Sequence, residues 1–351
     1  MENIDELLDF NPSDTSAFDS PVTSENNAQS NLFYRPNVKN STSDDKHYRA
    51  TIRLIYNPKD FNRSIVERTT YNLKDAQGNF YVDSLLSNGD KSCPIFKAWK
   101  QLHYSGKPEL EIHTTSGENN WFDRSTRRHI LIQVIKDDNK PELNGKFLIW
   151  ALKKNILTML DTKFYKPADP KKKVFLLDYL IGPALSLDIA PAKAGEPEFK
   201  VDYAASEFDT DIQPIIKTDG TALFSSDEMD LIEKYNEAKM KVIKAKSDED
   251  VAKGNTTIAT IKDELRAVFT KAVQYVTDNA PDLIAEGGYH PWSEELNNRV
   301  AEWIANVTKG IDPSSIASAN PTVAAASQPA APQAIPTATT DTGENKDDLP
   351  F

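Results

Sequence analysis

The chain has 351 residues, of which 39% are hydrophobic, and a mean hydropathy of −0.55. Its most apolar stretch, residues 174–192, contains Asp178 and Asp188, so we expect no membrane span. The acidic start MENIDELLDF lacks the basic and apolar regions of a signal peptide. The single cysteine, Cys93, excludes an internal disulfide and a four-cysteine or Cys2His2 zinc site. We therefore expect an intracellular protein that needs no metal or other cofactor.

Charge divides the chain into three blocks. Lys plus Arg against Asp plus Glu number 3 against 9 in residues 1–46, 25 against 19 in residues 47–205, and 13 against 25 in residues 206–351. The net charges are thus −6, +6 and −12. The middle block also holds 19 of the 32 aromatic residues. Because a polyanion is repelled by the acidic flanks, only the middle block is expected to contact nucleic acid.

The first two blocks predict an arm followed by a β-rich core. Residues 1–46, rich in Ser, Asn, Asp and Pro, are expected to form an acidic, largely disordered arm. From Tyr48 onward, apolar and polar residues alternate with period two, which indicates strands with one buried face. Strands are predicted at 48–56, 63–72, 78–86, 128–136, 145–151, 185–189 and 199–203, and short helices at 94–103 and 152–163. The pattern favours an α+β protein whose core, residues 47–205, is a Greek-key barrel of the OB-fold type.

The last block predicts helices and then a tail. Ser225 and Glu228 form a capping box before an amphipathic helix, a second helix covers residues 258–276, and a third follows Ser293. These helices, within residues 206–310, could cover the barrel, pack together or meet a second protomer. Residues 313–340 contain no charged side chain and are rich in Ala, Pro, Ser and Thr. We therefore expect residues 311–351 to be a disordered linker with an acidic end.

No arrangement typical of an enzyme stands out in the sequence. The five histidines share no spacing suited to metal ligation, and no glycine-rich phosphate loop is present. Asp137 and Asp138 follow a predicted strand, where such a pair usually solvates a turn but could also bind magnesium. We expect no catalysis, and a metal-dependent nuclease using these two carboxylates is the alternative from another class.

A binding function has more support. Trp121 and Phe122 precede three arginines in a predicted loop, and an aromatic platform beside guanidinium groups suits unpaired bases and their phosphates. In the other interpretation the aromatic rings pack beneath that loop. Phe80 and Tyr81 must face opposite sides of one strand, so one is core and the other is a second platform. The candidate nucleic-acid contacts are Arg49, Arg53, Tyr81, Trp121, Phe122, Arg124, Arg127, Arg128, Lys153, Lys154, Lys171, Lys172 and Lys173.

The extreme C-terminus combines acidic and apolar groups. The sequence DDLPF ends in a free carboxylate next to an aromatic ring, a combination that a pocket with a basic rim and an apolar floor can capture. A solvated end is the other interpretation. The candidate partner-binding residues are Asp347, Asp348, Leu349, Pro350 and Phe351.

Several segments resemble the replication single-stranded-DNA-binding proteins of tailed phages, the helix-destabilising family typified by the T-even phages. The similarity rests on YRATIRLIYNP, GNFYVDSLLSNGDKSCPIFKAW and ILIQVIKDDNKPELNGKFLIWALKKNI, within residues 45–205. The terminal DDLPF is similar to the C-terminal peptide of bacterial single-stranded-DNA-binding proteins. The resemblance implies sequence-independent binding of single-stranded DNA in phage replication, recombination and repair, in the cytoplasm of a bacterial host. It also implies that replication and recombination proteins dock on the tail.

The sequence departs from that family in two respects. The family's type member has a zinc site near the Ser-Cys-Pro segment, whereas here Phe96 and Leu85 stand where cysteines are expected. We therefore predict no zinc, and apolar packing of Leu85, Phe96 and Trp99 in its place. The N-terminal arm is acidic where the family's is basic, which leaves self-association open. A recombination mediator or strand-annealing protein is the alternative within the DNA-binding class.

Overall fold

The computed structural model describes residues 30–88, 92–115, 119–165, 175–197 and 200–315. The chain divides into two compact units. Unit 1 comprises Met1–Arg68 and Arg127–His290, and unit 2 comprises Thr69–Thr126 and Pro291–Phe351. This division does not follow the sequence blocks 47–205 and 206–310, because unit 2 combines a segment from each of them.

Eight strands lie in the described part of the chain. They are β1 (Phe33–Tyr34), β2 (Tyr48–Ile55), β3 (Ile65–Asp75), β4 (Gly78–Asp83), β5 (Asp123–Asp137), β6 (Phe147–Ala151), β7 (Pro183–Ile189) and β8 (Glu207–Ile212). In unit 1 the strand order is β1-β6-β5-β2-β7-β8, and in unit 2 β3 lies between β4 and β5. β1 and β6 pair in parallel, whereas the pairs β2–β5, β2–β7, β3–β4, β5–β6 and β7–β8 are antiparallel.

The architecture is mixed α and β, with a large open sheet. In the part of the chain that the structure describes, no pairing joins the edge strands β1 and β8, so the predicted barrel is not closed. Six predicted strands correspond to β2–β7. The strand predicted at 199–203 is wrong, since this segment contributes a single bridge between Asp202 and Ala190. The neighbouring β8 was not predicted, because EFDTDI is mostly charged and lacks a clear apolar alternation.

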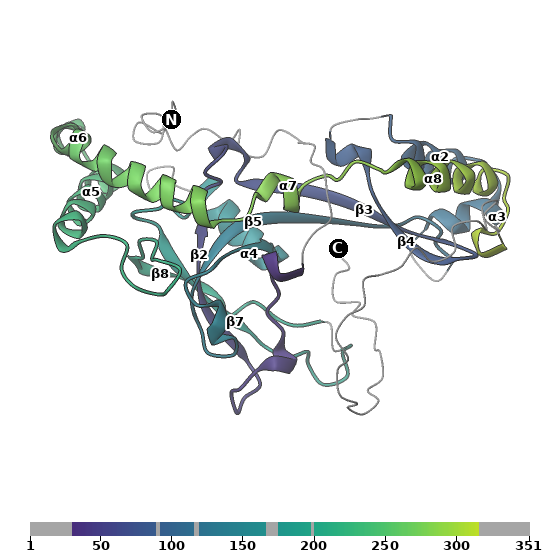
Figure 1. Ribbon diagram of the computed structural model, residues 1–351, viewed down its shortest axis with the longest axis horizontal. Coiled ribbons are helices and arrows are strands. Elements are labelled where there is room, and N and C mark those ends of the chain that lie inside the picture. The colour runs from purple at the N-terminus through teal and green to yellow at the C-terminus, as the bar shows by residue number, and fades with distance from the viewer. Residues whose placement is uncertain (1–29, 89–91, 116–118, 166–174, 198–199, 316–351) are drawn as a thin grey trace, which may run out of the picture. The chain divides into compact units, whose positions relative to one another are not determined.

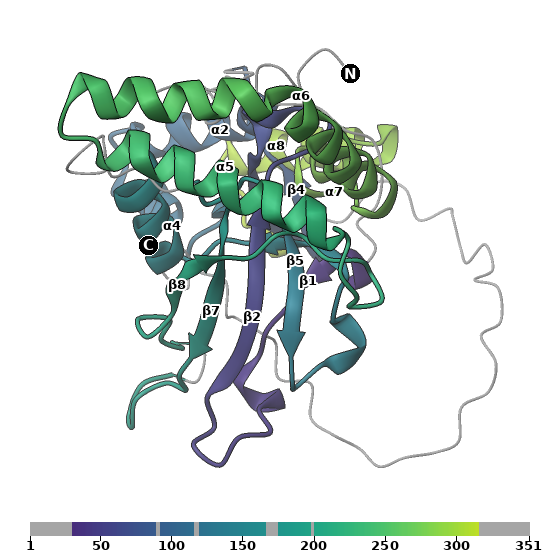
Figure 2. The same ribbon diagram turned by 90° about the vertical axis from the view of Figure 1, so that its left-hand side faces the viewer.

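The predicted helices are present, but the one predicted over residues 258–276 begins ten residues earlier, and two short helices were not predicted. They are α2 (Pro94–His103), α3 (Pro108–Glu111), α4 (Lys154–Leu160), α5 (Ser226–Lys244), α6 (Asp248–Asn279), α7 (Leu283–Gly287) and α8 (Glu294–Val307). The predicted capping box of Ser225 and Glu228 is present at the start of α5, and Ser293 caps α8. Figure 2 shows α5 and α6 side by side, running across the strands of unit 1. None of the helices described is both long and apolar enough to cross a membrane.

Each unit has its own apolar core. In unit 1, side chains of the sheet such as Ile52 and Ile132 pack with Ile232 of α5 and Phe269 of α6. In unit 2, α2 and α8 lie side by side (Figure 1) and cover one face of β3 and β4. The predicted packing of Leu85, Phe96 and Trp99 against this second core is confirmed, and Cys93 is buried within it.

Candidate nucleic-acid interface

The clearest candidate for base stacking is Tyr81 on β4 of unit 2. Tyr81 is 70% exposed, whereas its neighbours Phe80 and Val82 are 7% and 1% exposed and belong to the core. Successive side chains of a strand point to opposite faces, so the backbone holds the Tyr81 ring on the open face of the sheet. The prediction that one aromatic residue of this pair is core and the other is outside is confirmed.

Polar side chains surround Tyr81 on this face. Directly opposite residues of an antiparallel pair share a face, and the register places Asn72 opposite Tyr81. The hydroxyl oxygens of Thr70 on β3 and Ser125 on β5 lie 3.0 Å apart. We call this set, with Tyr81, the open face of unit 2; its other members are Thr70, Asn72, Lys74, Asn79, Asp123 and Ser125. Amides and hydroxyls around one exposed ring offer stacking and hydrogen bonding together.

The two aromatic residues before β5 differ from the prediction. Phe122 is 3% exposed and packs edge-on against Trp303, with ring centroids 5.1 Å apart. Trp121 is half-buried, and one face of its ring stacks on His113 at 3.7 Å. Phe122 is therefore a core residue and not a stacking platform, because unit 2 needs large apolar side chains to fill its small core. Trp121 has at most one ring face left for a base.

Arg124 and Arg127 lie on a strand and not in the predicted loop, because β5 begins at Asp123, five residues before the predicted start of the strand at Arg128. Arg124, in unit 2, is exposed and lies close enough to Tyr71 to oppose the rise that burial causes in the pKa of that phenol. Arg127 and Arg128, in unit 1, are exposed as well, and Arg128 Nε lies 3.0 Å from Glu67 Oε2. All three side chains are therefore at the surface.

Arg53 is the main correction to the predicted set. It is fully buried beneath residues 175–182 and does not lie on a solvent-exposed face of the strand. Burial lowers its pKa to about 10. Its guanidinium donates to the backbone carbonyls of Leu54, Leu176, Asp178 and Gln213. A Cβ on Gly182 would overlap it. Arg53 is therefore a structural residue, and two-residue periodicity could not show that a covering segment crosses this end of β2.

The remaining predicted contacts, Arg49 and the lysines, differ in their exposure and in their partners. Arg49 is half exposed, but its guanidinium pairs with Asp45 and Asp188. Lys153 occupies the N-cap position of α4 without a side-chain capping hydrogen bond, and Lys154 is exposed at the first position of that helix. Lys171, Lys172 and Lys173 and the tail residues Asp347, Asp348, Leu349, Pro350 and Phe351 lie outside the described residues.

The two aspartates of the nuclease alternative have different surroundings. Asp137 is fully buried, and its carboxylate accepts hydrogen bonds from the hydroxyls of Tyr34 and Tyr48 at 2.9 and 2.6 Å and from two backbone N–H groups. Burial is also the largest cause of a raised pKa at Tyr48. Asp138 is exposed and lies 3.2 Å from Lys136 Nζ. Within the described ranges, no group of three or more His, Cys, Asp or Glu side chains could hold a metal ion.

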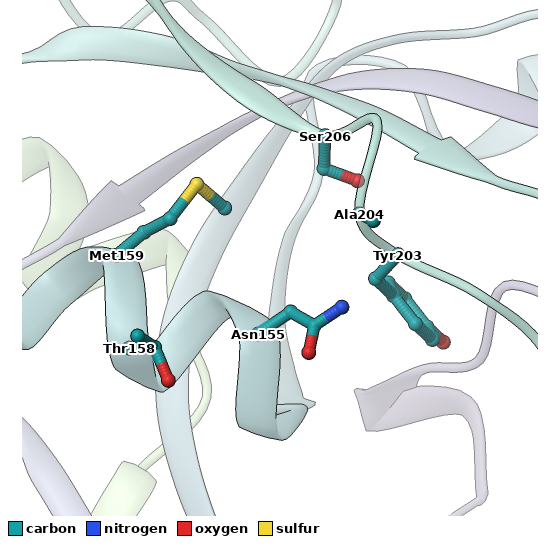
Figure 3. A pocket seen from close by; sticks show the side chains of 6 residues that line it. All are labelled: Asn155, Thr158, Met159, Tyr203, Ala204 and Ser206. Atoms are coloured by element: carbon teal, nitrogen blue, oxygen red, sulfur yellow. The ribbon is translucent and has the colours of Figure 1, made fainter.

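Sequence reasoning missed two features. Phe96, Trp99 and His103 stack along α2 and lead to Tyr104, which is 74% exposed; the spacing of three and four residues was the available signal. In unit 1, a hollow of about 250 Å³ lies between α4 and residues 203–206 (Figure 3). Its two walls are far apart in sequence, so no local pattern could reveal it.

A scan against models of known protein families and a search of curated proteins each found no match. The resemblance to phage single-stranded-DNA-binding proteins therefore stays a prediction.

Proposed function

We propose that the chain binds single-stranded DNA without sequence preference and that the open face of unit 2 is a principal contact surface. The observation that carries this proposal is the 70% exposure of Tyr81 on a strand whose neighbouring residues are buried. Moving a large aromatic ring out of water is favourable. A ring held outward by a rigid sheet is therefore suited to a partner that covers it.

Unpaired bases are the partner that this surface fits best. Every base has a π face, and stacking on an aromatic side chain tolerates any sequence. A duplex hides those faces, so the same surface discriminates against paired DNA. The amides of Asn72 and Asn79 and the hydroxyls of Thr70 and Ser125 can hydrogen-bond base edges or sugars without demanding one base.

Cationic side chains support the same proposal. Lys74 lies on the open face, and Arg124 is exposed in the same unit. Arg127 and Arg128 give unit 1 its own exposed cations. Guanidinium groups suit phosphates because their planar donors match the phosphate oxygens. Binding through such groups releases counterions, so log K should fall by about 0.7 per neutralised phosphate against log salt.

Further parts of the proposal rest on sequence alone. We propose that the OB-fold relationship holds for the core, since OB-folds are partly open barrels. The acidic, apolar-tipped residues Asp347–Phe351 would recruit replication, recombination and repair proteins. A phage-encoded chain would act in this way in the cytoplasm of a bacterial host. The protein would have no catalytic activity and would favour strand separation by mass action.

The test is a fluorescence titration of the full chain with oligothymidine. Tyr81→Ala should weaken binding by about 1 to 3 kcal/mol, the usual value of one stacked base. Tyr81→Phe is the matched control, because it keeps the ring and loses only the hydroxyl, and it should bind like the unchanged chain. If the unchanged chain does not bind oligothymidine at low salt, the proposed function is wrong. Equal affinity of all three chains would remove Tyr81 from the site.

A further inference from the structure

The hollow in unit 1 has a rigid frame. Asn155, Thr158 and Met159 follow helical spacing and line one wall, while Ile156 and Leu160 of the same helix are buried. The opposite wall is residues 203–206. The Ser206 hydroxyl donates to the Asp188 carbonyl and accepts from the Asp188 N–H, both at 3.0 Å, so this segment is fixed to β7.

The lining of the hollow carries no formal charge. Its residues are Asn155, Thr158, Met159, Tyr203, Ala204 and Ser206. A second hollow of about 440 Å³, between α5 and α6, differs in being lined by Lys241, Lys244 and Lys253 together with Asp250. An uncharged lining disfavours a phosphate and suits a neutral group that carries both donors and acceptors.

One polar group in the hollow is available to a ligand. Thr158 Oγ1 donates to its own helix at Lys154 O, and Ser206 Oγ is engaged with Asp188. The Asn155 side-chain amide makes no hydrogen bond to any described residue and lies across the hollow from the Tyr203 ring, as Figure 3 shows. It offers a donor and an acceptor side by side.

We infer that this hollow takes a single unpaired nucleobase, with the Asn155 amide on the base edge and Tyr203 forming part of the wall. At about 250 Å³ the hollow is smaller than the usual pocket for a drug-sized ligand and suits one small ring system. Each base presents neighbouring hydrogen-bond donors and acceptors on its pairing edge. An amide that can rotate can therefore hydrogen-bond to any of the bases. Lys154, exposed beside Asn155, supplies a cation for the adjoining phosphate. This inference rests on the proposed binding of single strands.

The test uses oligothymidines with one 2-aminopurine at successive positions, bound to the full chain. Asn155→Leu keeps the side-chain size but removes the amide, and Asn236→Leu, on α5 of the same unit, is the matched control. We expect all three variants, Asn155→Leu, Asn155→Asp and Asn236→Leu, to be as thermally stable as the unchanged chain, because the substituted side chains lie away from the core. We expect one 2-aminopurine position to report a distinct environment with the unchanged chain and with Asn236→Leu. That signal should be lost, and affinity should fall about tenfold, with Asn155→Leu and Asn155→Asp.

Two outcomes would overturn the inference, and they are distinguishable. If the unchanged chain binds oligothymidine but both Asn155 variants match Asn236→Leu in affinity and fluorescence, the hollow holds no base while the proposed function stands. If the unchanged chain does not bind oligothymidine, the proposed function and the base site fail together.

Discussion

Units 1 and 2 use the same kinds of side chain in opposite ways. Unit 1 buries its most polar strand residues: Arg53 donates to four backbone carbonyls, and Asp137 accepts from two tyrosines. Unit 2 leaves large apolar side chains in water. Of the residues that the structure describes, all the large hydrophobic ones that are exposed belong to this smaller unit, namely Tyr81, Tyr104, Ile112 and Ile311.

The difference shows that residue type does not determine a role in binding. Tyr48 and Tyr81 both lie on strands, yet one hydroxyl is buried against Asp137 and the other ring faces solvent. A buried polar side chain contributes to the stability of the fold, because losing its hydrogen bonds leaves buried polar groups without partners. Exposure keeps an aromatic ring available. The comparison therefore predicts stability effects at the buried polar residues of unit 1 and binding effects at the open face of unit 2.

The largest expected effect is at Arg53. Arg53→Met should lower the free energy of unfolding by about 4 kcal/mol or more, because several buried carbonyls lose their donors. Arg49→Met, four residues away and half exposed, should cost less than about 1 kcal/mol. Urea denaturation measures both. If Arg53→Met keeps its stability and loses only DNA affinity, the residue belongs to the binding surface after all.

Asp137 should come next. Asp137→Ala leaves two buried tyrosine hydroxyls without their acceptor, which should cost about 3 kcal/mol. Asp138→Ala removes an exposed side chain and should change stability by less than about 0.5 kcal/mol. Thermal or urea unfolding compares them. A magnesium-dependent nuclease would behave differently: both variants would lose cleavage of a labelled single strand.

A pH-dependent contribution is expected in unit 2. Burial raises the pKa of Asp75, but hydrogen bonds from Arg299 at 2.7 and 2.9 Å and from the Gln77 N–H outweigh it and hold the pKa below its ordinary 3.8. Because the pKa of Asp75 is lowered in the folded state, its ionised carboxylate stabilises the fold above pH 3.8. This stabilisation is lost as the pH falls through the folded pKa.

Asp75→Asn should therefore cost about 2 kcal/mol at pH 7 and less as the pH falls through the folded pKa of Asp75. Tryptophan fluorescence during urea denaturation is a suitable measurement, because Trp99, Trp121, Trp292 and Trp303 lie in unit 2 and only Trp150 lies in unit 1. A loss that does not shrink as the pH is lowered through this range would mean that the ion pair is not the source of the effect.

The smallest effect should be at the start of α5. Ser225→Ala removes the hydroxyl that accepts from the Glu228 N–H and should cost about 1 kcal/mol. Ser226→Ala, at the adjacent exposed position, should be nearly neutral. Thermal unfolding of the two variants is the measurement, and a larger loss at Ser226 would contradict the cap assignment.

The sequence predicted local structure better than it predicted the site. The period-two strands, the α2 boundaries and the Ser225 capping box depend on neighbouring residues, so they are visible in the chain. The open sheet edge, the cover over Arg53 and the core position of Phe122 depend on segments more than a hundred residues away. Tyr81 was predictable because strand alternation forced a choice between it and Phe80.

Photocrosslinking of the full chain to oligothymidine carrying 5-iododeoxyuridine tests the central claim most directly. The open face of unit 2 predicts a crosslinked peptide that contains Tyr81, and the crosslink should be lost when excess unlabelled single strand, but not duplex, is added. Efficient crosslinking with no adduct on β4 would contradict the account, because the exposed ring would then not meet an unpaired base.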